Sequence, residues 1–214
     1  MIIDAHTHIY PDHVAEKAIS TILGNTSGQV DAYTNGTLAN LLSSMDKAGI
    51  DLSVVLTVAT SPQQGQGIIK WLRQIINYSP RLIYFGSVHP ADPNYKSVIR
   101  EMAAMGLQGL KFHPAYQGHP ANGKEAYRIY EEVANNDLIM YFHSGIDLSM
   151  PDSDYATVER LAQVLKDFSG AKIIMAHAGG YEEWDKVLEL FADQSCYYDT
   201  SFVLDRMAQD RHAM

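Results

Sequence analysis

Apolar and polar positions along this chain follow two alternating patterns. Short runs rich in β-branched, leucine and aromatic residues are typical of buried strands, and they recur at residues 1–5, 52–59, 82–88, 109–112, 138–143, 172–177 and 195–201. Between most of these runs, apolar residues recur every three or four positions, as in amphipathic helices, at residues 37–48, 67–78, 95–105, 123–135, 154–168 and 181–192. Gly49, Gly106 and Gly170 follow expected helix ends, where a left-handed residue commonly terminates a helix.

Alternating strands and helices predict a parallel sheet covered by helices. Two architectures share this pattern, the open doubly wound sheet and the (β/α)8 barrel of the TIM type. A dinucleotide-binding sheet of the first kind requires Gly-x-Gly-x-x-Gly after its first strand, whereas this chain has His-Thr-His at positions 6–8. Polar residues also stand at the carboxyl ends of many strands, as barrel active sites require. We therefore predict an α/β fold of the TIM-barrel type, formed by residues 1–214 as a single domain.

Composition narrows the classes of partner. The 25 acidic and 16 basic residues give a net charge of −9, which disfavours nucleic-acid binding and leaves no polybasic patch for anionic membranes. The single cysteine, Cys196, excludes an intrachain disulfide and a cysteine metal cluster. No apolar run reaches the roughly 18 residues of a membrane span, and the N-terminus does not resemble a signal peptide. We expect a cytoplasmic protein that acts on a small molecule, with a homo-oligomer as an open alternative.

A pair of histidines follows the first apolar run. His6 and His8 are separated by one residue, and side chains at this spacing in a strand project from the same face, about 7 Å apart along it. Two imidazoles at the carboxyl end of a strand can bind one transition-metal ion, and they supply two corners of a tetrahedral zinc site. We predict that both histidines bind a divalent metal, with zinc as the first choice.

Histidines also stand at the ends of other expected strands. Six of the nine lie at such positions: His6, His8, His89, His113, His143 and His177. Lys111 precedes His113 by two positions, so their side chains share a strand face. A single histidine at such a place is usually half-buried and bonded to a loop. Six at one rim indicate a catalytic centre, because the active sites of barrels form at the carboxyl ends of their strands.

These motifs resemble those of the amidohydrolase superfamily of metal-dependent hydrolases. The resemblance is strongest to the branch with aminocarboxymuconate-semialdehyde decarboxylase, resorcylate-type decarboxylases and lactone hydrolases. The matching pieces are Asp-Ala-His-Thr-His at 4–8, Gly-Leu-Lys-Phe-His-Pro at 109–114, the histidine at 143 and Ala-His-Ala-Gly-Gly at 176–180. The resemblance covers the whole chain and implies a (β/α)8 barrel enzyme with a divalent metal.

The resemblance also implies which residues act. His143 would join His6 and His8 as a metal ligand, and His177 would be a catalytic base or an electrostatic stabiliser, although it is a ligand in some members. Elementary chemistry agrees with these roles. Three neutral imidazoles leave a coordination position open for a water molecule, and a fourth histidine nearby can take its proton.

Three other residues complete the predicted site. Lys111 is placed among the catalytic residues. The lysine at this strand is carbamylated and bridges two metals in some members of the superfamily, but here we expect it to bind a substrate carboxylate. His113 and His89 are assigned to substrate binding.

The chain departs from the family at its C-terminal end. The family carries an aspartate at the end of strand eight, whereas this sequence stops at residues that read as the early part of the seventh helix, residues 205–214. We expect an incomplete sequence. A partner chain that supplies the missing strand and a non-catalytic barrel remnant are the alternatives. Asp199 is a weak candidate for the missing carboxylate because it follows strand seven.

The expected reaction is hydrolysis of a small carboxylated or cyclic substrate, such as a lactone, amide or ester, by a metal-activated water. Non-oxidative decarboxylation of a small unsaturated or aromatic acid is the alternative, and the sequence does not separate the two. Phosphoesterases and deoxyribonucleases with His-x-His on a barrel fit less well, because their further acidic ligands are not found in order. Residues 10–35 form the expected lid, and the pocket candidates are Tyr33, Tyr116 and Trp184.

Overall fold

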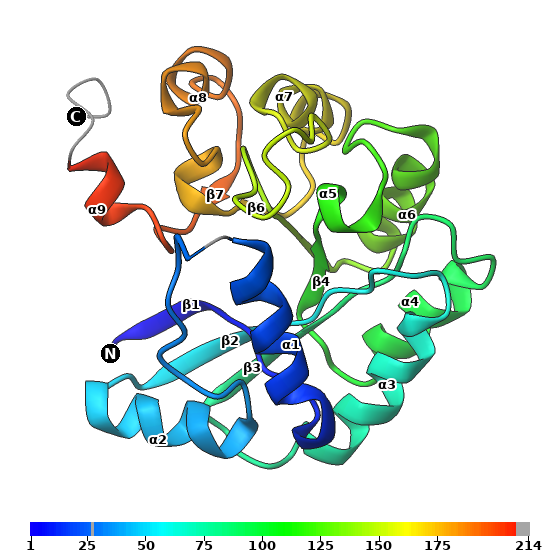
Figure 1. The fold of residues 1–214 in the computed structure, drawn as a ribbon. Coiled ribbons are helices and arrows are strands. Elements are labelled where there is room, and N and C mark those ends of the chain that lie inside the picture. The colour runs from blue at the N-terminus through cyan, green and yellow to red at the C-terminus, as the bar shows by residue number, and fades with distance from the viewer. Residues whose placement is uncertain (27, 209–214) are drawn as a thin grey trace.

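The computed structural model describes residues 1–26 and 28–208. Seven parallel strands form one sheet in consecutive order, so that each strand pairs with the next one along the chain (Figure 1). The strands are β1 (Ile3–Thr7), β2 (Leu52–Leu56), β3 (Leu82–Gly86), β4 (Gly109–Phe112), β5 (Ile139–Phe142), β6 (Ile173–Met175) and β7 (Tyr197–Tyr198). Parallel neighbours need a long crossover connection, and helices provide most of these crossovers here.

Helices surround the curled sheet, while one helix lies over the carboxyl ends of its strands (Figure 1). The helices are α1 (Asp12–Asn25), α2 (Leu38–Ala48), α3 (Gln64–Ile75), α4 (Tyr95–Ala104), α5 (Pro114–Gln117), α6 (Lys124–Asn135), α7 (Val158–Asp167), α8 (Trp184–Leu190) and α9 (Leu204–Met207), with the 3-10 turn η1 (His177–Gly179). Helix α1 is the one that lies across the strand ends. None of the helices in the described ranges is long and apolar enough to cross a bilayer.

The predicted barrel type of fold is confirmed, and so is the lack of an eighth strand in the described residues. There, β1 pairs only with β2, and β7 pairs only with β6. Residues 205–214 were expected to begin the seventh helix. Helix α9 covers the first of them, and residues 209–214 lie outside the described part of the chain.

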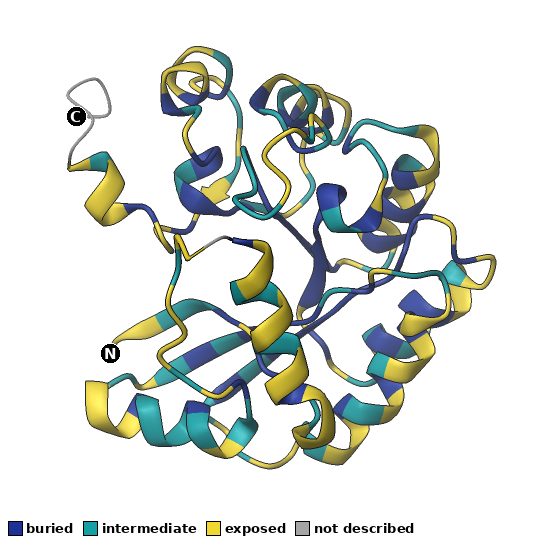
Figure 2. Cartoon of the chain, viewed as in Figure 1, coloured by how far each residue is buried: buried dark blue, intermediate teal, exposed yellow. Residues whose placement is uncertain are grey.

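Two apolar layers hold the strands in place. The larger layer lies between the sheet and its helices, where side chains such as Leu110, Phe112 and Ile129 are at most 1% exposed. Figure 2 shows the strands near the middle of the sheet as mostly buried. The smaller layer lies on the opposite face of the strands and consists of Leu56, Phe85, Tyr141 and Ala176. Because side chains alternate along each strand, both faces of the strands are packed in these layers, and the site residues follow at the carboxyl ends.

Several boundaries differ from those predicted. Residues 12–25, expected only as part of a lid, form helix α1. The last predicted strand, residues 195–201, contracts to two residues in β7, and β6 ends at Met175, so that His177 lies in a turn. The left-handed conformations predicted for Gly49, Gly106 and Gly170 are confirmed, with φ angles of 68°, 82° and 92°.

Candidate metal centre

A cavity of about 1230 Å³ opens at the carboxyl ends of the strands, beneath helix α1. Five of the seven predicted site residues line it: His6, His8, His113, His143 and His177. Lys111 and His89 are not part of its wall among the described residues. The sheet therefore brings together five side chains that are up to 171 positions apart in the sequence, as the strand-end pattern predicts.

His6 and His8 face each other at the end of β1. The Nδ1 atom of His8 donates to the carbonyl oxygen of Leu56 at 2.8 Å, and the Nδ1 atom of His6 lies 2.7 Å from Oδ2 of Asp199. A neutral imidazole that donates through one nitrogen has a lone pair on the other. With these tautomers, the two Nε2 atoms, 3.2 Å apart, direct lone pairs at each other, an arrangement that a cation bound between them would stabilise.

The spacing of this pair suits a metal ion. Two nitrogen ligands about 2.0–2.1 Å from a tetrahedral ion lie roughly 3.3 Å from each other, close to the observed Nε2–Nε2 distance. Burial and the nearby Lys111 charge lower the pKa of His8 to about 3, and the same two causes, burial first, hold the pKa of His6 well below its usual range. Both imidazoles are consequently neutral near pH 7, which is the form that binds metals.

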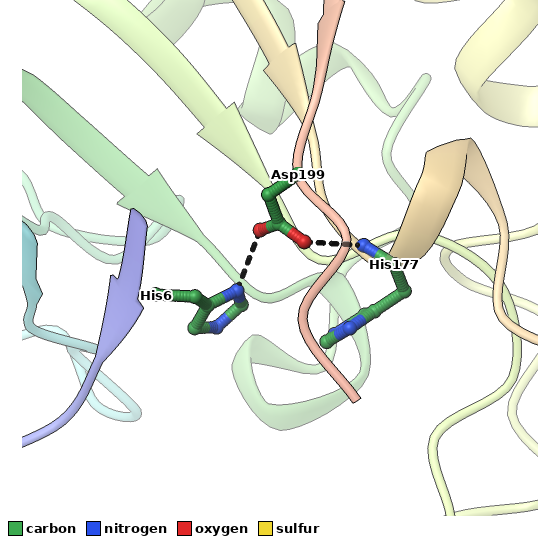
Figure 3. Close-up of side chains that lie close together, drawn as sticks. All are labelled: His6, His177 and Asp199. Carbon is green, nitrogen blue, oxygen red and sulfur yellow. Dashed lines mark hydrogen bonds and ion pairs between the residues drawn. The ribbon is translucent and has the colours of Figure 1, made fainter. Parts of the chain in front are cut away.

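Asp199, which directly follows β7, links His6 at the end of β1 to His177 after β6 (Figure 3). Its Oδ2 atom accepts from His6 and from the hydroxyl of Tyr141, and its Oδ1 atom accepts from the backbone N–H groups of His177 and Ser201, each at 2.9 Å. Burial raises the pKa of the Asp199 carboxyl, but the hydrogen bonds from His6, Tyr141 and His177 outweigh it and hold the pKa well below its usual range. An ionised carboxylate thus fixes the tautomer and orientation of His6.

The backbone at His177 is strained. His177 and Ala178 have φ angles of 59° and 54°, a region that residues other than glycine seldom adopt. Three contacts hold the turn: the carboxylate of Asp199 accepts the His177 N–H, the indole N–H of Trp184 donates to the His177 carbonyl oxygen at 3.1 Å, and Nδ1 donates to the Ser201 carbonyl oxygen at 3.0 Å. Such strain clusters at functional sites.

These contacts leave His177 with the lone pair of Nε2 directed into the cavity, toward His143. Since Nδ1 donates, Nε2 is an acceptor, and it lies 3.2 Å from Nδ1 of His143. Burial, followed by the Lys111 charge, lowers the pKa of His177 to about 4. The imidazole is therefore unprotonated near neutral pH and can accept a proton.

On its other side, His143 belongs to a second group with His113 and Asp147. The rings of His113 and His143 are stacked at 4.0 Å, and Tyr116 stacks on the far face of His113 at 3.9 Å. Nε2 of His113 lies 3.3 Å from Oδ2 of Asp147, whereas the buried Nε2 of His143 is 3.8 Å from the same oxygen and has no hydrogen-bond partner within the described part of the chain. Burial raises the pKa of Asp147, but the His113 hydrogen bond and charge and the Ser149 hydrogen bonds lower it overall.

Lys111 lies below the cavity, with no exposed surface and no hydrogen-bond partner for Nζ among the described residues. The ammonium group sits 4.7 Å from the centre of the Tyr141 ring. Burial lowers the pKa of Lys111 to about 7. Its charge adds to burial, the larger cause, in lowering the pKa values of His6, His8 and His177, and its position gives no support to a direct contact with substrate.

The remaining predictions have mixed outcomes. His89 packs against His119 and accepts the Ala91 N–H through Nδ1 at 3.0 Å, so its position does not support substrate binding. Tyr116 lines the cavity. Tyr33 is 93% exposed and Trp184 is buried behind His177, and neither is part of the wall in the described ranges.

Two carboxylates, Asp199 and Asp147, belong to the site although the sequence pattern marks the first only weakly and the second not at all. Donor atoms lie within 4.8 Å of one another in the group His6, His177 and Asp199 and in the group His113, His143 and Asp147. A metal-bound histidine usually donates its second N–H to a carboxylate, and this rule is the signal that points to Asp199. Nothing in the local sequence marks Asp147, which lies in the loop after β5.

Comparison with known proteins agrees with the geometry. Residues 3–213 match the family described as Amidohydrolase. The chain matches no curated protein sequence. Among solved structures, an uncharacterised TIM-barrel protein from Bordetella bronchiseptica is similar, with 15% identity and a TM-score of 0.71, over 93% of this chain and 74% of that chain.

Two further solved structures are of proteins with stated activities. A 5-carboxyvanillate decarboxylase from Sphingomonas paucimobilis is 14% identical with a TM-score of 0.67, over 99% of this chain and 84% of that chain. A probable 2-pyrone-4,6-dicarboxylic acid hydrolase from Acinetobacter baumannii, with citric acid bound, is 15% identical with a TM-score of 0.60, over 97% and 74%. At these identities the likeness shows a shared fold.

Proposed function

The chain belongs to the amidohydrolase family of enzymes, and we propose that it is a metal-dependent hydrolase of a small carboxylated or cyclic substrate such as a lactone, amide or ester. The observation that carries this proposal is the 3.2 Å contact between the Nε2 atoms of His6 and His8. The Nδ1 atoms of both rings face acceptors, so both Nε2 lone pairs are available to a cation between them, which supports the proposal.

His6 and His8 would hold a divalent metal, and His143 would be the third ligand. Nδ1 of His143 faces His177, whereas Nε2 faces Asp147. This orientation supports Nδ1 as the nitrogen that would bind the metal. Imidazole donors suit zinc well but also suit iron and copper, while carboxylate donors suit manganese. When bound, the ion would act as a Lewis acid that polarises a carbonyl group and acidifies a water molecule.

His177 would move the proton in this reaction. Its Nε2 atom has a lone pair, faces the cavity and is held by a strained, fully bonded turn. Asp199 would keep both His6 and the His177 backbone in place, and burial, with a smaller contribution from the Lys111 charge, would keep the surrounding imidazoles neutral. His113, with Tyr116 stacked on it, would form one wall of the substrate site.

Decarboxylation of an aromatic or unsaturated acid is the second candidate. It is favoured by the fold likeness to the 5-carboxyvanillate decarboxylase, which extends over 99% of this chain. The same side chains would serve, since His177 could take a proton from a water molecule or a substrate hydroxyl and pass it to the ring carbon whose carboxylate leaves as carbon dioxide. A barrel without activity is the third alternative, distinguished by bound metal without turnover of any substrate.

One experiment separates these candidates. The full chain is loaded with zinc or manganese, its metal content is measured by mass spectrometry, and acid release from lactones and esters is compared with carbon dioxide release from aromatic acids. We expect metal-dependent acid release that is lost in His6→Ala, with metal affinity reduced at least tenfold. The matched control is His13→Ala, a change at an exposed histidine of α1. Carbon dioxide release alone, or unchanged metal affinity in His6→Ala and His8→Ala, contradicts the proposal.

A further inference from the structure

Helix α1 has an apolar face that does not pack on the protein core. Its only buried residue is Ala15, and no α1 side chain belongs to the apolar clusters formed by the described residues. Instead, Val14, Ala18 and Ile22 line the histidine cavity. Their spacing of four residues places them on one face of the helix.

Helix α3 provides the opposite wall. Gly67, Ile68 and Trp71 line the same cavity, and Ile68 and Trp71 also pack against the main core. We call the space between Val14, Ala18, Ile22, Ile68 and Trp71 the α1–α3 groove. It is continuous with the histidine site, because both sets of residues line a single cavity.

The groove has little charge to offer a polar ligand. Lys17 is the only lysine or arginine in the cavity wall within the described ranges, and α1 and α3 otherwise contribute Thr21 and Gln64 as polar groups. If a substrate had a second carboxylate far from the histidines, Lys17 would therefore be the one lysine or arginine among the described wall residues that could bind it. The volume of about 1230 Å³ exceeds the usual 300–1,000 Å³ of small-molecule pockets, which leaves space beyond a single ring.

We infer that the substrate has an extended apolar arm that lies in the α1–α3 groove while its reacting group lies at the histidines. This inference rests on the proposed function for the position of the reacting group. The substrate class is then a carboxylic acid, or its lactone, ester or amide, with a hydrocarbon chain of several carbons. Burial of the arm would give α1 the apolar contacts that the protein core does not provide.

The test measures binding rather than turnover. Straight-chain carboxylates from acetate to decanoate are titrated into the metal-loaded full chain by calorimetry. Each buried CH2 group should lower Kd roughly three- to fourfold, so decanoate should bind at least a hundredfold more tightly than acetate. A Kd that does not change with chain length overturns the inference.

Two glycine variants locate the arm. Gly67→Trp places an indole in the groove at a position where a Cβ atom meets nothing within 4 Å, and it should raise the Kd of decanoate at least tenfold. Gly24→Trp is the matched control, because Gly24 is an exposed α1 residue with equally open surroundings and is not part of the cavity wall. Equal decanoate affinity in the two variants contradicts the groove as the binding place.

Further measurements test whether something other than a substrate arm occupies the α1–α3 groove. They also distinguish failure of this inference from failure of the proposed function. If light scattering shows a dimer that Gly67→Trp dissociates, a second copy covers the groove and the inference is wrong. His6→Ala should retain the dependence of Kd on chain length although turnover is lost. A wild-type chain that shows this dependence but hydrolyses nothing supports the groove and refutes the proposed reaction.

Discussion

His6 and Asp199 lie 193 positions apart in the sequence, and their side chains meet at 2.7 Å. The contact joins the end of β1 to the segment after β7, across the side of the sheet where no strand pairing is present in the described residues. Because the same carboxylate also accepts the His177 N–H, one buried aspartate holds two histidines of the candidate site.

Asp199→Asn tests this relationship. The amide keeps the size of the side chain but loses the negative charge that fixes His6 with its proton on Nδ1. Metal affinity should fall about 10- to 100-fold, as is usual when the carboxylate partner of a ligand is removed. Competition with a fluorescent chelator measures the change, and Asp193→Asn is the exposed control. Equal affinities in wild type and Asp199→Asn would refute the assigned role.

His177→Ala separates a proton carrier from a metal ligand. If His177 acts in proton transfer, the variant should retain its metal and lose turnover by roughly 100-fold or more. Metal analysis of the purified variant, together with its kcat, gives the answer. A variant that purifies without metal would show that His177 is a ligand.

Asp147→Asn tests the second carboxylate. In our interpretation His143 binds metal through Nδ1 and donates its Nε2–H toward Asp147, whose Oδ2 atom is 3.8 Å away. Loss of the charge should lower metal affinity about tenfold and shift the His143 ring resonances in nuclear magnetic resonance spectra. Asp152→Asn, at an exposed position nearby in the chain, provides the control. Unchanged metal affinity and unchanged resonances would remove Asp147 from the site.

Because burial lowers the pKa of Lys111, this residue should make the free energy of unfolding increase with pH above neutral. Its pKa is about 7 in the folded chain and about 10.4 when unfolded, so the unfolded state binds more protons between these values. The free energy of unfolding should therefore rise with pH in this window, relative to Lys111→Met, by up to about 1.4 kcal/mol per pH unit. Urea titrations of both metal-free proteins at pH 7.5, 8.5 and 9.5 measure the difference. Parallel pH profiles would contradict it.

Much of the fold could be predicted from the sequence because the strand signal is strong where both faces are buried. The runs around Val55, Phe85 and Met140 are continuous and apolar, and each forms a strand. The sequence did not predict helix α1 because its apolar residues line a cavity rather than pack in the core. The three-to-four-residue apolar repeat is weaker in such a helix. β7 shrinks because Tyr197 and Tyr198 are exposed rather than buried.

The site was predictable only as far as strand ends reveal it. His6 and His8 share a strand, so spacing alone brings them together. Asp147 and Asp199 reach the histidines through loops, whose paths no local pattern records. The expectation that Lys111 binds a substrate carboxylate stays a prediction, because a strand position indicates which face a side chain occupies but not how deeply it is buried, and here Lys111 has no exposed surface.

The distance in sequence between His6 and Asp199 also has a consequence for biosynthesis. At roughly 5–20 residues per second, the ribosome adds Asp199 about 10 to 40 seconds after His6. During that interval His6 has no carboxylate partner, and the turn at His177 lacks the acceptor for its N–H. The nascent chain can pair its early strands, but the proposed metal centre would lack its aspartate, so tight metal binding would be acquired late, after Asp199 has been added.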